Sequence, residues 1–370
     1  MERPDELLTI PEIVDAARAK LSPQVWDYSC GGADSETTLQ RNRLAFDHLT
    51  FLPRVLRGVG KPDISTSFLG YRLSSPVMLA PVGSIARFHP DGALACARVA
   101  ERAGTASFVG TLASPSLEEV RAGADCPLIF QLYVYGDRRW IERLVRRVED
   151  AGYSAICLTV DLAAYGRRER DLHNRFFPRE SIERPNLGAA YEAAGLVVRD
   201  EYNASLSWED LAWLRGITEL PLILKGILSP EDAGLAVEHG VDAVYVSNHG
   251  GRQLDHAPSA IEVLPEIVEA VGEEAEIVAD SGFMRGTDVV KALAMGARAV
   301  AIGKLMIWGL AAGGEEGLLR TLELLKTETT TTMANVGVGR VADLSPGNLR
   351  PSLPPDPAPR TVAKPPPKEV

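Results

Sequence analysis

The chain has 370 residues, of which 45% are hydrophobic and 24% charged, as is typical of a soluble globular protein with a large core. Its net charge of −11 and isoelectric point near 5.2 argue against a broad surface for nucleic acid or an anionic membrane. The four cysteines form no C-x-x-C pair, and no signal peptide or uninterrupted apolar span is recognisable. We therefore expect a cytoplasmic protein with no metal site.

Residues 1–75 are expected to form an N-terminal helical extension. The apolar residues of Ile10–Lys20 have helical spacing, and no strand alternation of comparable strength follows before residue 76. We expect this segment to cap one end of the main domain or to pack beside it.

Eight short apolar runs follow from residue 76, each ending in a polar or glycine-bearing turn before a helical pattern. The predicted strands are Val77–Ala80, Ala106–Gly110, Leu128–Tyr133, Ala155–Val160, Leu222–Gly226, Ala243–Ser247, Glu276–Asp280 and Ala299–Gly303. Helical patterns such as Trp140–Ala151 and Thr287–Met295 lie between them. Eight repeats predict an α/β fold of the (β/α)₈ TIM barrel type over residues 76–340, with an open doubly wound sheet as the alternative.

Two segments fall outside this repeat. Residues 162–206 form an unusually long, charged loop after the fourth strand, and such a loop is either a lid or binding segment or partly disordered. Residues 345–370 contain nine prolines and predict an extended, largely disordered tail.

Polar residues occur at the carboxyl ends of the predicted strands. In a (β/α)₈ barrel these ends meet at one mouth, where catalytic residues lie. The set comprises Gln131, Tyr133, Thr159, Asp161, Lys225, Ser247, His249, Arg252 and Asp280. Their common position predicts an active site.

His249 and Arg252 stand three residues apart on a glycine turn after the sixth predicted strand. A histidine acts as a general base when a carboxylate fixes its orientation, and Asp161 is the available carboxylate. The Arg252 guanidinium can bind a substrate carboxylate through two parallel hydrogen bonds, and the Tyr133 hydroxyl can add a donor. The structural alternatives are a helix N-cap for Asp161, a solvated arginine and a half-buried aromatic.

The later strand ends predict a phosphate-bearing cofactor. Lys225 ends an otherwise apolar strand and needs an anionic partner in the barrel mouth. The last two strands end in Asp280-Ser281-Gly282 and Gly303-Lys304, where barrels build phosphate sites from backbone amides. The alternative is that these glycines only make tight turns.

Several motifs together resemble the FMN-dependent α-hydroxy acid oxidases and dehydrogenases, which include glycolate, lactate and mandelate enzymes. The motifs are Gln131-Leu132-Tyr133-Val134-Tyr135, Leu158-Thr159-Val160-Asp161, Gly166-Arg167-Arg168 and Ser247-Asn248-His249-Gly250-Gly251-Arg252-Gln253-Leu254-Asp255. The resemblance runs from about Leu21 to Ala334. It implies FMN-dependent oxidation of a small L-2-hydroxy acid to the 2-oxo acid, with oxygen or another electron acceptor, in a homo-oligomer, by resemblance a tetramer.

The resemblance also implies residue roles. His249 is the implied base and Asp161 its partner, while Lys225 faces flavin N1 and the C2 carbonyl. The implied substrate contacts are Tyr28, Tyr133, Arg168 and Arg252. The other implied cofactor contacts are Pro81, Val82, Gly83, Gly110, Gln131, Thr159, Ser247, Asp280, Gly282, Gly303 and Lys304.

The sequence departs from the family pattern in both pockets. The family run Asp-Gly-Gly-aliphatic-Arg reads Asp280-Ser281-Gly282-Phe283-Met284, so a serine replaces a glycine and a methionine an arginine. Lys304 replaces an arginine and loses its bidentate fork, which predicts weaker FMN binding. Leu112 replaces a pocket aromatic, and Gly110 stands near flavin N5 where many members have serine or threonine. Gly83 is more typical of dehydrogenases than of oxygen-using oxidases.

Three other interpretations remain. Type 2 isopentenyl diphosphate isomerase is another FMN barrel, but it does not need His249 with Arg252 and Asp161. A barrel of the IMP dehydrogenase type would need a nucleophilic cysteine in a mouth loop, whereas Cys157 lies within a predicted strand and Cys126 before one. A non-catalytic barrel scaffold, suggested by the departures at the phosphate end, predicts protein without flavin.

Overall fold

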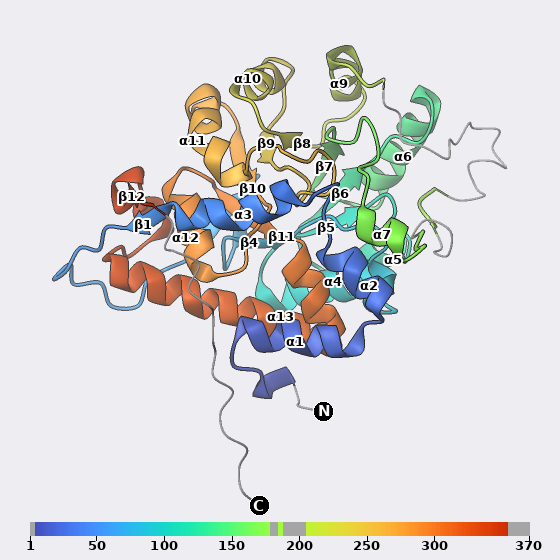
Figure 1. Cartoon of the computed structure of the whole chain (residues 1–370). Coiled ribbons are helices and arrows are strands. Elements are labelled where there is room, and N and C mark those ends of the chain that lie inside the picture. Colours follow the sequence, from blue (N-terminus) through green and yellow to red (C-terminus); the bar gives the residue numbers. More distant parts are fainter. Residues whose placement is uncertain (1–3, 178–183, 188–204, 354–370) are drawn as a thin grey trace, which may run out of the picture.

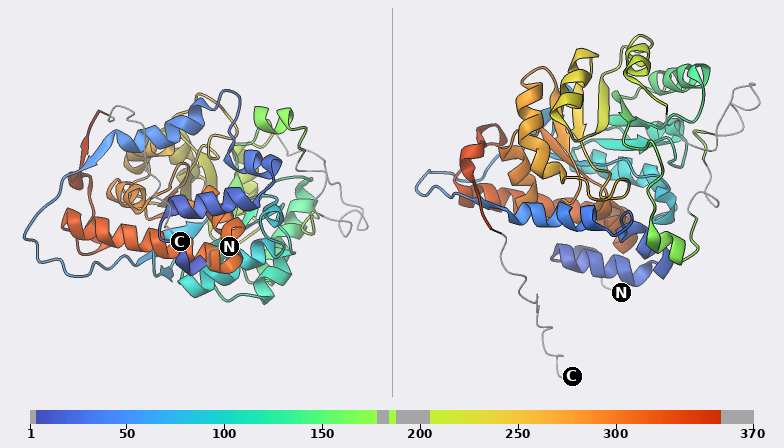
Figure 2. Two further views of the ribbon diagram at one scale, coloured as in Figure 1. Left: turned by 60° about the horizontal axis from the view of Figure 1, so that its bottom comes forward. Right: turned by 45° about the horizontal axis from the view of Figure 1, so that its top comes forward.

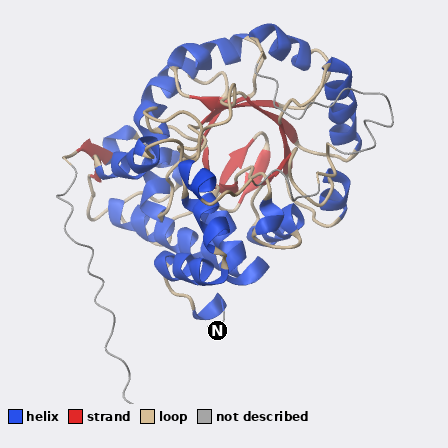
Figure 3. Ribbon diagram, turned by 45° about the vertical axis from the view of Figure 1, so that its right-hand side comes forward, coloured by secondary structure: helices blue, strands red, loops and turns tan. Residues whose placement is uncertain are grey.

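The structure, a computed structural model, describes residues 4–177, 184–187 and 205–353. Eight parallel strands close into a barrel at its centre, and helices surround them (Figure 1; Figure 3). The strands are β4 (Val77–Leu79), β5 (Ser107–Gly110), β6 (Leu128–Leu132), β7 (Ala155–Thr159), β8 (Leu222–Ile227), β9 (Ala243–Val246), β10 (Glu276–Ala279) and β11 (Ala299–Ile302). β11 pairs with β4 and closes the ring. The predicted (β/α)₈ barrel is confirmed, and the open sheet is wrong.

The helices between the strands form the outer layer of the barrel. They are α4 (Gly92–Ala103), α5 (Leu117–Ala122), α6 (Arg138–Asp150), α9 (Trp208–Arg215), α10 (Pro230–Glu238), α11 (Ala260–Val271) and α12 (Gly286–Ala294). A further short helix, α7 (Glu169–His173), lies in the loop after β7. α13 (Lys304–Val336) follows the last strand and is interrupted at Gly313 and Gly314, where the backbone is not helical. Figure 2 shows α13 lying along α1 (Ile10–Lys20) at the edge of the molecule.

Local sequence signals explain where several helices begin. The Thr9 hydroxyl accepts a hydrogen bond from the Glu12 amide, and the Glu12 carboxylate accepts one from the Thr9 amide, so the two residues cap α1. Asp137 caps α6 in the same sense, because its carboxylate accepts from the Trp140 amide at 2.9 Å. α6 then buries Trp140 and Leu144 against the barrel.

The N-terminal part contains strands as well as helices, which corrects the expectation of a helical extension. Its elements are α1, α2 (Pro23–Cys30), α3 (Thr37–Asp47), β1 (Leu49–Phe51), β2 (Thr66–Phe68) and β3 (Tyr71–Leu73). β2 and β3 form an antiparallel hairpin whose Phe68 and Leu73 pack with the inner barrel residues Met78 and Tyr245. The Leu69 amide at its tip bonds to Glu276 at the start of β10. The hairpin therefore closes the N-terminal end of the barrel.

Part of the predicted tail is folded. Residues 346–348 form a 3₁₀ turn, and β12 (Leu349–Pro351) pairs antiparallel with β1. The buried Leu349 side chain, which is 6% exposed, anchors this strand, so the prediction of disorder from Ser345 onward is wrong for these residues. Residues 354–370 lie outside the described part.

The long loop after β7 is described in part, and α7 belongs to it. The Asn174 side chain donates to Asp27 on α2 at 2.7 Å, and Arg170 forms an ion pair with Glu36 at 2.6 Å. These contacts hold residues 165–176 beside α2 at the barrel mouth. Residues 178–183 and 188–204 of the loop lie outside the described ones. Within the described residues, no helix has the length and apolarity to cross a membrane.

Candidate active site

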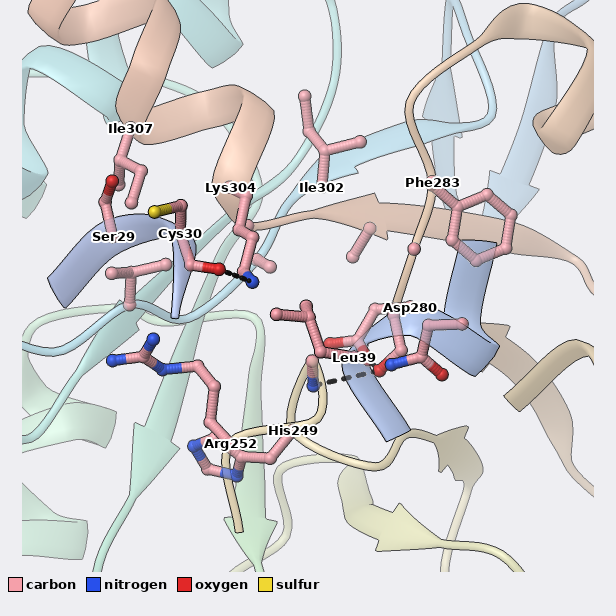
Figure 4. A pocket seen from close by; sticks show the side chains of 18 of the residues that line it. Ser29, Cys30, Leu39, His249, Arg252, Asp280, Phe283, Ile302, Lys304 and Ile307 are labelled. Atoms are coloured by element: carbon pink, nitrogen blue, oxygen red, sulfur yellow. Dashed lines mark hydrogen bonds between the residues drawn. The ribbon is translucent and has the colours of Figure 1, made fainter. Parts of the chain in front are cut away.

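A cavity of about 1080 Å³ opens at the carboxyl ends of the barrel strands. Its walls come from the turns after the strands on one side and from α1, α2, α3 and the start of α13 on the other. Figure 4 shows Cys30, Lys304 and Arg252 on one side of this cavity and Asp280 and Phe283 on the other. The predicted site residues that line it are Tyr28, Pro81, Val82, Gly83, Tyr133, Thr159, Arg168, Lys225, His249, Arg252, Asp280, Gly282, Gly303 and Lys304.

The four remaining predicted residues lie behind this lining. Gln131 donates to the Thr159 hydroxyl at 2.8 Å, and a side chain at Gly110 would come within 3.0 Å of the Gln131 oxygen. Ser247 and Asp161 contact Lys225 and His249, as described below. All predicted site residues are thus brought together at one end of the barrel, although their roles stay predictions.

His249 and Asp161 form a partly buried pair, with side chains 18% and 12% exposed. Nδ1 of the imidazole lies 2.9 Å from Asp161 Oδ1, while Nε2 lies 3.2 Å from the Tyr133 hydroxyl. Because a carboxylate accepts hydrogen bonds, the proton is assigned to Nδ1, and Nε2 can accept a proton. Burial lowers the pKa of His249 despite the opposing charge of Asp161, so the imidazole is neutral near pH 7.

Asp161 and Tyr133 complete the surroundings of this base. Burial opposes ionisation of Asp161, but the charges of His249 and Lys225 outweigh it and hold the pKa of Asp161 below its ordinary value. Burial and the Asp161 charge raise the pKa of Tyr133 well above its ordinary value, so its hydroxyl stays protonated and can donate. The other Asp161 oxygen, Oδ2, is buried without a hydrogen-bond partner among the described residues.

Arg252 is held by backbone carbonyls at the C-terminal end of α2. Its Nη1 donates to the Tyr28 carbonyl at 2.7 Å and to the Gly31 carbonyl at 2.8 Å. Its guanidinium carbon lies 4.9 Å from the centre of the Tyr28 ring. Burial and the Arg168 charge lower the pKa of Arg252, an effect that a bound anion would relieve. The site therefore contains a fixed guanidinium suited to a carboxylate.

Arg168 lies next to this guanidinium. Its Nη1 donates to the Tyr165 hydroxyl at 2.7 Å, and its Nη2 donates to Gln253 at 3.3 Å. The side chain is buried, with 7% of its surface exposed, and its guanidinium stacks 4.4 Å from the Tyr165 ring centre. Two arginines therefore face the same end of the cavity.

Lys225 of β8 supplies a buried cation in the cavity lining. Its Nζ donates to the Ser247 hydroxyl at 3.0 Å and lies 4.0 Å from Asp280 Oδ2. Burial opposes protonation, but Asp161 and Asp280 outweigh it and raise the pKa of Lys225, so it remains charged. This charge can stabilise an anion that develops in the cavity.

Two basic side chains at the predicted phosphate end of the cavity bond to protein oxygens. Lys304 Nζ donates to the Cys30 carbonyl at 2.9 Å and lies 3.5 Å from the Gly31 carbonyl (Figure 4). Arg43 donates to the Gly282 carbonyl and pairs with Asp288 at 2.6 Å. Both cations line the cavity while bonded to protein oxygens.

Sequence reasoning missed three kinds of site residue. The carbonyls of α2 that hold Arg252 carry no side-chain signal. Asn42 of α3 exchanges two amide hydrogen bonds with Asn248, at 2.9 and 2.7 Å, and so braces the His249 turn. Ser281 bonds to the same turn. These contacts join segments far apart in sequence, and only Ser281 had a signal, its departure from the family glycine.

The fold and the site define a class: a (β/α)₈ barrel enzyme whose cofactor-sized cavity is lined by a histidine, arginines and a buried lysine. The FMN-dependent dehydrogenase family model matches residues 17–351. The chain therefore belongs to the FMN-dependent dehydrogenase family, as the sequence resemblance predicted, and is an FMN-dependent hydroxy acid oxidoreductase.

Known relatives span nearly the whole chain. Glycolate oxidase 5 of Oryza sativa subsp. japonica is 43% identical over 349 residues, covering 92% of this chain and 95% of the relative. Peroxisomal (S)-2-hydroxyacid oxidase GLO3 of Arabidopsis thaliana is 42% identical over 355 residues, covering 94% and 97%.

Solved structures share this fold. An oxidised active mutant of (S)-mandelate dehydrogenase superposes with a TM-score of 0.89 at 38% identity, covering 94% of this chain and 100% of that one. Mandelate oxidase with (S)-2-phenylpropionate superposes with a TM-score of 0.86 at 39% identity, covering 94% and 99%.

The residues present fit FMN. Gly83 and Gly303 leave the cavity walls open, since a side-chain carbon on either would meet other atoms only at 3.7 Å or beyond. The charged Lys225 and the Gln131 amide suit the polar edge of a flavin ring. Gly303 caps α13 without a side-chain hydrogen bond, so the first amides of this helix can hold a phosphate.

Proposed function

We propose that this enzyme oxidises an L-2-hydroxy acid with an apolar side chain to the corresponding 2-oxo acid. The observation that carries the proposal is the hydrogen-bonded His249–Asp161 pair, which shares one cavity with Arg252 and Lys225. A base beside a carboxylate clamp suits a substrate whose reacting carbon is bonded to its carboxylate. The names of relatives, (S)-2-hydroxyacid oxidase and (S)-mandelate dehydrogenase, support this substrate class and configuration.

Arg252 binds the substrate carboxylate in this proposal. The two carbonyls that hold Nη1 fix the plane of the guanidinium before substrate arrives, which reduces the entropy lost on binding. The protonated Tyr133 hydroxyl adds a donor, and Tyr28 supports the guanidinium with its ring face. Arg168 strengthens the positive potential at this end of the cavity.

His249 accepts the proton that the substrate loses. Asp161 holds the imidazole through Nδ1, so the lone pair of Nε2 faces the cavity, and the same carboxylate stabilises the imidazolium that forms. The proton comes from the α-carbon or from the hydroxyl, and the same geometry serves both routes. Bound FMN supplies the acceptor for the two electrons. Lys225 places a positive charge where negative charge develops.

The part of the cavity proposed to receive the substrate side chain is apolar. Val82, Leu112, Leu162 and Tyr165 line the cavity, and a side-chain carbon at Gly83 would only touch Leu112 at 3.7 Å. Burying apolar substrate surface here contributes about 25 cal/mol per Å². We therefore propose that substrates with branched aliphatic or aromatic side chains have higher kcat/KM than glycolate.

Anaerobic reduction tests the proposal. The purified, FMN-loaded enzyme is mixed without oxygen with a series of L-2-hydroxy acids and their D enantiomers, and the flavin absorbance near 450 nm is followed. We expect bleaching by L acids, faster with apolar side chains, and formation of a 2-oxo acid in equal amount. An enzyme that binds FMN but is bleached by none of them would disprove the proposed function.

The electron acceptor is part of the proposal. Gly83 lines the cavity where family oxidases often carry alanine, and we propose that an acceptor other than oxygen reoxidises the enzyme faster than oxygen does. Stopped-flow reoxidation with air-saturated buffer and with a soluble quinone measures the two rates. Faster reoxidation by oxygen would assign the enzyme to the oxidases.

A further inference from the structure

The turn that carries His249 has an unfavourable backbone conformation. His249 has a φ of 60°, in the left-handed region that residues other than glycine adopt uncommonly. Such a residue keeps its conformation only when the surrounding structure determines it. The contacts that hold this turn are therefore important for the position of the base.

Two serine hydroxyls hold three successive amides of this turn. The His249 amide donates to Ser247 Oγ at 3.0 Å. The Gly250 amide donates to Ser281 Oγ at 3.1 Å, and the Asn248 amide makes a longer contact with the same oxygen at 3.4 Å. The hydroxyl of Ser281 in turn donates to Asp280 Oδ1 at 2.8 Å. Ser281 thus connects the His249 turn to the carboxylate at the end of β10.

Ser281 is itself in a left-handed conformation. Its φ is 77°, and the side chain is only 6% exposed. Glycine adopts this conformation without strain, and the family motif has glycine at this position. A serine here adds strain and supplies a hydroxyl that glycine lacks, and this hydroxyl is fully used in the hydrogen bonds described.

We propose that Ser281 is a positioning residue for the general base, because its hydroxyl fixes the turn that presents His249 to the substrate. The proposal rests on the proposed function for the identity of the base. The two serines also link this turn to Lys225, which donates to Ser247 and lies 4.0 Å from Asp280. The base and the cation beside the cofactor therefore share one hydrogen-bonded support.

Two variants distinguish the effect of the Ser281 hydroxyl from the effect of backbone strain at this position. Ser281→Ala removes the hydroxyl and keeps a side chain at a positive φ, whereas Ser281→Gly removes both and restores the family residue. If the hydroxyl positions the base, both variants lower kcat roughly tenfold at saturating FMN and substrate, because small displacements of a base are costly. Arg252 has its own anchors on α2, so KM changes by less than about threefold.

A second measurement does not depend on turnover. In the parent enzyme, the contact with Asp161 raises the pKa of His249. A loosened turn weakens this contact, so we expect a lower imidazole pKa in both variants. NMR of labelled histidine in the FMN-loaded protein measures it, with His249→Gln to assign the signal among six histidines. The acid limb of the kcat profile should shift in the same direction.

Thr105→Val is the matched control. Thr105 is buried and its hydroxyl donates to the Val77 carbonyl at 2.7 Å, so the variant loses one buried hydrogen bond at the opposite end of the barrel. It should destabilise the fold while kcat and the His249 pKa stay unchanged.

The outcomes are decisive when FMN affinity is measured in parallel by fluorescence titration. A lower kcat with a shifted His249 pKa and an FMN Kd within about threefold of the parent supports the proposal. An unchanged His249 pKa, an unchanged kcat, or an effect confined to FMN affinity overturns it, the last by making Ser281 a cofactor contact. A parent enzyme that turns over no hydroxy acid refutes the proposed function, while the NMR comparison still tests Ser281.

Discussion

At the residue scale, opposing electrostatic effects set the pKa of His249, the proposed base. Burial lowers the pKa of His249 and Asp161 raises it, with burial prevailing. A neutral imidazole is needed to accept a proton, and a nearby carboxylate is needed to stabilise the cation that forms. In the proposed reaction, His249 is therefore neutral before it accepts a proton, and Asp161 stabilises the imidazolium that forms.

The pH dependence of turnover follows from this balance. Since the His249 pKa lies below its ordinary value of 6.5, kcat/KM should be constant above pH 7 and fall as the pH decreases through the lowered pKa. Asp161→Asn removes the charge that raises this pKa, so the acid limb should move to lower pH while the maximal rate falls roughly 100-fold or more. Rates between pH 5 and 9 measure both effects, and an acid limb that moves to higher pH would contradict the assignment.

Lys304 predicts a second pH effect, on stability. Burial and the Arg252 charge lower its pKa from 10.5 to about 7 in the folded protein without FMN. Between these values the unfolded chain binds more protons, so this residue makes stability rise with pH across the window, by at most about 1.4 kcal/mol per pH unit.

Denaturant titrations of flavin-free protein from pH 7 to 10 compare the parent with Lys304→Met. The increase in the free energy of unfolding with pH that is attributed to Lys304 should disappear in this variant. It should persist in Lys326→Met, which changes an exposed lysine on α13. Equal slopes in the parent and Lys304→Met would show that Lys304 keeps an ordinary pKa.

The side chains of the site were predictable where they follow a strand directly. His249, Asp161 and Lys225 come within three residues of a strand end, and the topology of a barrel brings such ends together. The anchors of Arg252 were not predictable, because they are backbone carbonyls about 220 residues away that become neighbours only in the folded chain.

At the scale of elements, the presence of a continuous apolar run decided which strands could be predicted from the sequence. Each of the eight barrel strands lies within the range predicted for it from the sequence, except that β8 extends one residue further, to Ile227. β1, β2, β3 and β12 have three residues each, as β4 has, but unlike β4 they include exposed positions and form no continuous apolar run. β1 and β12 depend on partners distant in sequence, such as Phe51 and Leu349, whereas β2 and β3 pair with each other and pack on the barrel.

The pairing of β1 with β12 predicts a measurable contribution to stability. Leu349 is 6% exposed, and Leu349→Ala should lower the free energy of unfolding by about 2 kcal/mol through lost burial and a residual cavity. Leu353→Ala, four residues on, is the control, since Leu353 is 88% exposed and its truncation should change stability by less than about 0.5 kcal/mol. Urea denaturation compares them, and equal effects would mean that β12 adds nothing.

At the scale of the whole molecule, the cavity joins the barrel to its N-terminal helices. Its lining includes Ile10 and Val14 of α1, Leu39 of α3 and Trp308 of α13 besides the strand ends. A ligand in this cavity therefore contacts segments from both ends of the chain, and its binding should stabilise the fold as a unit.

Removal of FMN should lower the melting temperature. At a free FMN concentration of 100 times Kd, binding stabilises the folded state by about 2.7 kcal/mol, which for a chain of this size is roughly 3–5 °C. Thermal denaturation with and without FMN measures the shift. Riboflavin is the matched control ligand, because it has the ring without the phosphate and should give a smaller shift; equal shifts would show that the phosphate end contributes no affinity.

The ribbon of β1 and β12 also has a consequence for the order of folding. It joins residues separated by 300 positions, with the whole barrel between them, so loop-closure entropy opposes its formation until the barrel has brought its ends together. The ribbon should form among the last structures, and its amides should exchange with deuterium before those of the barrel strands. A fluorophore pair across Thr50 and Arg350 would then time the completion of the fold.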